Sequence, residues 1–177
     1  MASPHVFPTV LTSKRLRISV PTSQDNPQVM AVAGDLEVSK HLRGVPHPYG
    51  PDDAQAWIQK AQDPVEPAIR RGIYRHTQLI GCIGLHPASD GALEVGYMLA
   101  RAVWRQGYGS EAALSFVRTA QQQFPTRHII AGHTRNNVAS GRILQTCGFV
   151  YTGEIEQDVC AATGLTDEVL MMRLPQA

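Results

Sequence analysis

The chain has 177 residues, of which 43% are hydrophobic and 18% charged, and its formal net charge at pH 7 is +1. This length suits one domain, and the composition is too apolar for a disordered chain. The near-neutral charge provides no basic face of the kind that nucleic-acid binding requires, so we expect no nucleic-acid partner.

The sequence also contains no signal for a membrane or an oxidising compartment. No stretch approaches the ~18 apolar residues that a membrane helix requires, and Met1 to Thr12 lacks the apolar core of a signal peptide. We therefore expect a cytoplasmic protein without a membrane partner, with residues 1–12 as a flexible N-terminal segment. Cys82, Cys147 and Cys160 are odd in number and have no C-x-x-C spacing, so we expect neither a disulfide framework nor a metal.

The first half of the sequence predicts one strand followed by helices. Apolar and polar residues alternate from Leu16 to Val20, which is typical of a half-buried strand. In chain order we then expect a helix that ends at Gly34, a short helical piece over 36–42, an irregular segment over 44–51, and a helix from Pro51 to just before Pro64.

The second half predicts a sheet with helical crossovers. We expect two strands between 68 and 86 joined near His76, a third over 93–100 after a turn at Asp90-Gly91, a helix over 109–124, a strand over 128–134, a helix over 138–146, and strands over 149–155 and 169–174. Gly148 occupies the position of a left-handed residue after a helix. This mixed order indicates one α/β (or α+β) domain over 1–177, with a mixed central sheet flanked by helices.

The sharpest motif is a glycine loop, Gly107-Tyr108-Gly109, at the start of the helix over 109–124. Glycines before a helix N-terminus turn backbone amides towards a phosphate. A P-loop is excluded because no lysine follows Gly109, and a dinucleotide fingerprint is weak because apolar residues 129–131 occupy its acidic position. A coenzyme A diphosphate loop and a plain helix start with convenient glycines remain. Glu111 falls in the first helical turn, where the helix dipole alone explains an acidic residue.

An ordered set of motifs carries a family resemblance. The runs are Leu11-Thr12-Ser13-Lys14-Arg15-Leu16-Arg17, Pro48-Tyr49 through Trp57-Ile58, Val95-Gly96-Tyr97-Met98-Leu99-Ala100-Arg101, Trp104-Arg105-Gln106-Gly107-Tyr108-Gly109, Asn137-Val138-Ala139-Ser140 and Cys147-Gly148-Phe149. Together they resemble the RimJ/RimL-like branch of the GNAT superfamily of N-acetyltransferases, over nearly the whole chain. Trp104 departs from the Gln or Arg of the wider family pattern, so Arg105 is the nearest substitute for a phosphate contact there.

The resemblance implies an enzyme that transfers the acetyl group of acetyl-CoA to a primary amine by direct attack in a ternary complex. The acceptor would be a protein N-terminus or a small-molecule amine. The resemblance places pantetheine against the backbone of Tyr97, Met98 and Leu99, and Asn137 near CoA or as a helix N-cap alone. It also places six residues around the diphosphate: Arg105, Gln106, Gly107, Tyr108, Gly109 and Ser110. The Tyr108 side chain has an alternative interpretation as a loop aromatic without a chemical role.

The chemistry needs a neutral amine, and the resemblance points to Glu94 as the base. By strand alternation Glu94 shares a face with Gly96 and Met98, and Gly96 leaves room for a substrate. The alternative is an exposed strand glutamate without a role. Ser140 resembles the family serine placed near the leaving thiolate as a proton donor, and first-turn helix capping is its alternative.

Three residues are candidates for the acceptor site: His47, Tyr49 and His133. The alternative for His47 and Tyr49 is a purely structural role in a loop braced by prolines, and the alternative for His133 is an ordinary polar role. A homodimer is compatible with the sequence. Two other functions stay open, a non-catalytic acyl-CoA-binding module and a nicotinamide-dependent enzyme.

Overall fold

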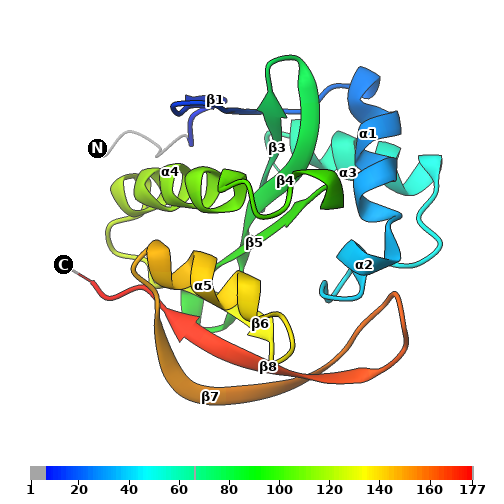
Figure 1. Cartoon of the computed structure of the whole chain (residues 1–177). Coiled ribbons are helices and arrows are strands. Elements are labelled where there is room, and N and C mark those ends of the chain that lie inside the picture. Colours follow the sequence, from blue (N-terminus) through cyan, green and yellow to red (C-terminus); the bar gives the residue numbers. More distant parts are fainter. Residues whose placement is uncertain (1–6, 66, 177) are drawn as a thin grey trace.

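Eight strands form one mixed sheet within residues 7–65 and 67–176, which are the residues that the computed structural model describes (Figure 1). The strands are β1 (Val10–Thr12), β2 (Arg17–Ser19), β3 (Ile69–Arg75), β4 (Gln78–Pro87), β5 (Leu93–Leu99), β6 (Ile129–Thr134), β7 (Val150–Val159) and β8 (Thr166–Arg173). Their spatial order is β1-β2-β3-β4-β5-β6-β8-β7. Neighbours pair antiparallel except β5 and β6, which are parallel.

Helices cover both faces of the sheet, as Figure 1 shows. One face packs against α1 (Asn26–Ala33), α2 (Leu36–Ser39) and α3 (Pro51–Gln62), and the other against α4 (Tyr108–Gln123) and α5 (Val138–Thr146). Short 3-10 helices cover Ser23–Asp25, Ser89–Gly91 and Arg101–Val103. The expected α/β domain, with a mixed sheet between helices, is confirmed.

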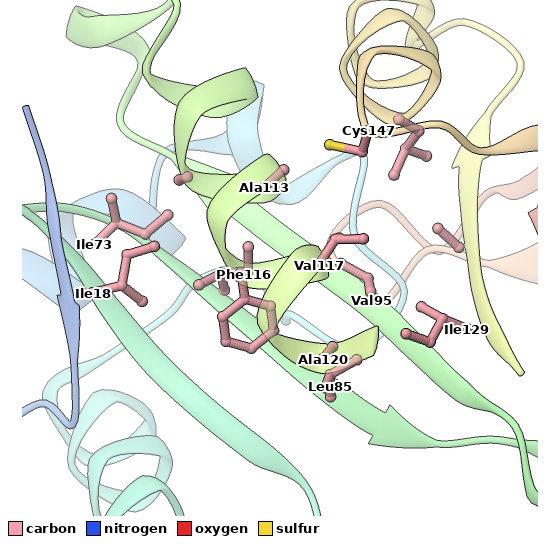
Figure 2. Close-up of a cluster of buried hydrophobic side chains, with 14 of the residues drawn as sticks. Ile18, Ile73, Leu85, Val95, Ala113, Phe116, Val117, Ala120, Ile129 and Cys147 are labelled. Atoms are coloured by element: carbon pink, nitrogen blue, oxygen red, sulfur yellow. The ribbon is translucent and has the colours of Figure 1, made fainter. Parts of the chain in front are cut away.

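The larger core lies under α4 because its apolar residues recur at helical spacing. Phe116 and Val117 are fully buried and meet Ile18, Leu85 and Val95 from the strands (Figure 2). Burial of this stripe fixes the helix against the sheet, so the N-terminus of α4 has a defined position relative to β5.

Local turn chemistry explains where the central elements end. His76 closes the β3–β4 hairpin at φ 56°, Asp90 and Gly91 turn the chain into β5 at φ 54° and 73°, and Gly148 ends α5 at φ 94°. All three expected turns are confirmed. β7 and β8 cover residues beyond those expected. β7 is an edge strand with no buried side chain, so apolar alternation does not mark its outer part.

The sequence predicted that residues 1–12 are flexible, and the structure shows that residues 7–12 are instead held to the core. Phe7 is buried, with its ring centroid 4.9 Å from that of Phe116, and Pro8 accepts hydrogen bonds from the Arg71 guanidinium. β1 then pairs with β2. The aromatic contact holds this part of the chain to the core, whereas residues 1–6 lie outside the described residues.

Two global features concern the described part of the chain alone. No helix there is long and apolar enough to cross a bilayer. Nor do three or more His, Cys, Asp or Glu side chains gather there as a metal site would require.

Candidate active site

β5 and β6 separate after a short paired stretch. Their register joins Leu93 to Ile129 and Glu94 to Ile130, and the two strands then diverge. On the far side β5 stays paired with β4 along its whole length. The sheet therefore opens into a wedge whose apex lies at Glu94.

Backbone alternation decides which groups of β5 face this wedge. The Leu93 amide donates to His128 across the β5–β6 edge, whereas the Ala100 amide donates to Ile80 of β4. The backbone groups of Tyr97 and Leu99 consequently face the wedge, and those of Met98 face β4. The expected pantetheine pairing is wrong for the Met98 backbone, because that residue is on the other hydrogen-bonding edge.

Trp104 has a role that its departure from the family pattern did not suggest. Its indole Nε1–H donates to the Leu99 carbonyl at 2.8 Å, which satisfies one wedge-facing group of β5. The residue thus ties the glycine loop to the end of the strand.

The glycine loop lies at the open end of the wedge. Gly107, at φ 80°, is the N-cap of α4, and Arg105 has φ 60°. The first intrahelical bond runs from the Glu111 amide to the Gly107 carbonyl, and no side chain caps the helix. The amides of Tyr108, Gly109 and Ser110 therefore precede the helical ladder and are available to an anion.

The other loop candidates have different surroundings. The Tyr108 ring is buried in the core and lies under the Arg15 guanidinium, in keeping with its second interpretation. Arg105 is exposed, and the Gln106 side-chain amide donates to the Ala102 carbonyl.

The first turn of α5 faces β5 across the wedge. Asn137 is its N-cap and accepts a hydrogen bond from the Ser140 amide at 3.2 Å, so the capping role of Asn137 is confirmed. The Ser140 hydroxyl instead lies 2.8 Å from the Tyr97 hydroxyl, so the capping alternative for Ser140 is wrong. Burial raises the pKa of Tyr97, which keeps the phenol protonated.

A cavity of about 660 Å³ opens from the wedge towards α3 and the β7–β8 hairpin. Glu94, Gly96 and Met98 line it, on the face that alternation predicted. A Cβ built on Gly96 would meet only His86 Cδ2, at 4.0 Å, so the floor at this position is open. Tyr97 and Ser140 line the same cavity.

Glu94 is half-buried and belongs to a charged cluster centred on Arg43. The Arg43 guanidinium lies 3.6 Å from Glu94, 3.1 Å from Glu156 and 3.0 Å from Asp158. Burial raises the pKa of Glu94; the Arg43 charge lowers that pKa, while Glu156 and Asp158 raise it. A carboxylate whose pKa is raised towards the working pH is a better base for taking a proton from an amine.

Two of the three acceptor-site candidates, Tyr49 and His133, line the cavity, and the third does not. Tyr49 lines the cavity, and burial raises its pKa to about 12. His47 is exposed and is not among the lining residues. The His133 ring is buried, with Nδ1 2.9 Å from the Thr134 carbonyl and Nε2 3.0 Å from the Tyr151 hydroxyl. These contacts engage both ring nitrogens.

Sequence reasoning missed two groups that shape the site. Arg43 carries no motif, since its three carboxylate partners lie on β5 and β7. Glu111 was explained by the helix dipole alone, but it also accepts hydrogen bonds from Ser13 and Arg15 of the β1–β2 turn. A charged residue in the first turn of the helix that follows the glycine loop was the available signal for the second group.

Comparisons with known proteins agree with this arrangement. The sequence pattern described as "Acetyltransferase (GNAT) domain" matches residues 15–150. The uncharacterized N-acetyltransferase YoaA of Bacillus subtilis (strain 168) is 30% identical over 158 residues, which cover 86% of this chain and 88% of YoaA.

Solved structures share the fold at low sequence identity. A GNAT-family acetyltransferase from Bacillus anthracis superposes with a TM-score of 0.80 at 17% identity, covering 94% of this chain and 98% of its own. Mycobacterium smegmatis RimJ, solved with CoA-disulfide, gives a TM-score of 0.77 at 13% identity and covers 90% of this chain and 81% of its own.

Proposed function

The chain belongs to the GNAT family of acetyltransferases, and on that premise we propose that it acetylates a primary amine by direct attack within a ternary complex. Acetyl-CoA-dependent acetyl transfer is the family's activity, and the structural neighbours are consistent with the RimJ/RimL-like branch. The acceptor is the N-terminus of a peptide or a small-molecule amine.

One observation carries the proposal: the β5–β6 wedge has free helix N-terminal amides at its mouth and a half-buried carboxylate at its apex. The amides of Tyr108 to Ser110 fit a diphosphate, since a helix N-terminus carries about half a positive charge. The wedge-facing backbone of Tyr97 and the Leu99 amide fit the pantetheine amides as an added strand.

Acetyl-CoA supplies the thioester, and the chain's own residues manage the protons. Glu94 takes the proton of the acceptor ammonium, directly or through water, and so frees the lone pair that attacks the thioester carbon. As the C–S bond breaks, the Ser140 hydroxyl, which accepts a hydrogen bond from Tyr97, gives its proton to the leaving sulfur to form the CoA thiol. The second proton that the attacking nitrogen loses on becoming an amide restores the Ser140 hydroxyl. The products are the N-acetylated acceptor and CoA.

A thermal-shift titration followed by a thiol-release assay tests the proposal. Acetyl-CoA is expected to raise the melting temperature, and thiol release is expected with at least one member of a panel of N-terminal peptides and small amines. Binding of CoA without thiol release across the panel would favour the non-catalytic module. Protection by NAD and not by acetyl-CoA would favour a nicotinamide-dependent enzyme.

A further inference from the structure

The β1–β2 turn is fastened to the first turn of α4 through one carboxylate. Glu111 Oε1 accepts hydrogen bonds from Ser13 Oγ and from the Arg15 amide, each at 2.7 Å, and Oε2 accepts one from Arg15 Nε at 2.6 Å. Burial raises the pKa of Glu111, but these hydrogen bonds outweigh it and the pKa is lowered. The carboxylate therefore stays charged and holds the Arg15 guanidinium in a fixed orientation.

The rest of that guanidinium lies against the glycine loop. Arg15 Nη1 donates to the Gln106 carbonyl at 3.0 Å, and Arg15 Cζ lies 4.3 Å from the centroid of the Tyr108 ring. A Cβ built on Gly107 would lie 3.3 Å from Arg15 Nη2. Arg15 thus contacts Gln106 and Tyr108 and lies beside the Gly107 between them.

The bond to Gln106 sets the orientation of one peptide plane. In a trans peptide the carbonyl and the following N–H point in opposite directions, so a Gln106 carbonyl held by Arg15 turns the Gly107 N–H away from Arg15. Glycine adopts both signs of φ at similar cost, so Gly107 does not by itself fix this plane. The contact that selects the orientation is the one from Arg15.

We propose that Arg15 is a positioning residue for the acetyl donor: it orients the Gln106–Gly107 peptide so that the Gly107 N–H points at the diphosphate of acetyl-CoA. The inference rests on the proposed function for the location of the diphosphate. Loss of one hydrogen bond to a charged group corresponds to roughly tenfold to hundredfold weaker binding.

Calorimetry with CoA on Arg15→Gln is the first test, and Arg75→Gln is its matched control. Arg75 Cζ lies 5.7 Å from the same Tyr108 ring, so the control removes an equal charge near the loop and leaves the Arg15–Gln106 hydrogen bond intact. We expect Arg15→Gln to raise the Kd for CoA roughly tenfold to hundredfold, and Arg75→Gln to raise it by less than about threefold. Equal effects of the two variants would assign the loss to net charge and overturn the proposal.

Donor kinetics separate a positioning role from general support of the fold. S-acetylpantetheine carries the same thioester without the diphosphate, so Arg15→Gln is expected to lower kcat/KM for acetyl-CoA through KM and to leave kcat/KM for S-acetylpantetheine unchanged. Equal losses with both donors would contradict the inference.

A second substitution keeps the test decisive if Arg15→Gln fails to fold. Arg15→Lys retains the charge, but a single ammonium cannot hold both Glu111 and the Gln106 carbonyl in the fork geometry of a guanidinium. It is expected to weaken CoA binding as well, and wild-type affinity in this variant would overturn the proposal. If the wild-type protein binds CoA and releases no thiol with any amine, acyl transfer fails as the function, and the calorimetric comparison still decides the role of Arg15.

Discussion

Replacement of Glu94 by Gln removes the proposed base and retains nearly the same side-chain shape. Glu94 lies at the apex of the wedge with its carboxyl in the cavity, and burial raises its pKa. Without it, the acceptor must enter as the amine that is already neutral in solution. We therefore expect kcat/KM for the acceptor to fall, and to rise about tenfold per pH unit until the amine's own pKa is reached.

The size of the loss follows from the acceptor's basicity. An alkyl amine with a pKa near 10.4 is neutral in roughly one molecule in 10³ at pH 7.4, whereas an α-amine with a pKa near 7.7–8.0 is neutral in about a quarter. The loss in Glu94→Gln is therefore expected to approach ~10³-fold for an alkyl amine and to be only a few-fold for an N-terminal peptide. The assay is thiol release at saturating acetyl-CoA between pH 6 and about pH 9.

Glu156→Gln is the matched control. Glu156 and Glu94 contact the same Arg43 nitrogen, at 3.1 and 3.6 Å, but Glu156 is on the exposed edge strand β7. The control loses the same charge without losing the base, so its rate at high pH should stay near that of the wild type. An unchanged pH–rate profile in Glu94→Gln, or an equal change in both variants, would refute the assignment of Glu94 as base.

Three further substitutions test the cavity, its electrostatics and the core. Gly96→Ala should fold normally, because its Cβ meets only His86 at 4.0 Å. The variant should have a lower kcat/KM for the acceptor and an unchanged Kd for CoA by calorimetry, and a loss of stability in urea would contradict this. Arg43→Gln removes the charge that lowers the pKa of Glu94, so the acidic limb of the kcat/KM profile should move to higher pH, and a shift to lower pH would contradict it. Phe116→Ala empties a fully buried site and should cost about 3–5 kcal/mol in urea denaturation, whereas a loss below ~1 kcal/mol would show that the core repacks.

Local patterns were sufficient for the order of the elements from β2 onwards and for the position of the glycine loop, but they missed β1. Period-2 alternation, helical spacing and positive-φ turn positions such as Gly148 involve residues close in sequence, and their outcome was confirmed. The face of Glu94 was also predictable, because strand alternation alone sets it. The same alternation, applied to hydrogen-bonding edges, excludes the Met98 backbone, but only once the β4–β5 register is known.

Side-chain partners were not predictable in this way. Tyr97 and Ser140 are 43 residues apart, and nothing near either residue indicates that their hydroxyls meet. His133 illustrates the same limit: alternation says that it points to one face, but not that Tyr151 already occupies its Nε2. Phe7 was assigned to a flexible segment, because a single aromatic residue carries no periodicity, and its ring packs against Phe116.

The sequence by itself determined the family, the mixed sheet and the position of the loop that suits a diphosphate, because short-range periodicity and glycine conformation encode them. Only the tertiary structure decided which charges share a site. Arg15 and Glu111 lie 96 residues apart, and Arg43 reaches Glu94 only after the α2–α3 loop folds over β5. Pairs of this kind depend on how the sheet twists and how the helices pack on it, so no local pattern records them.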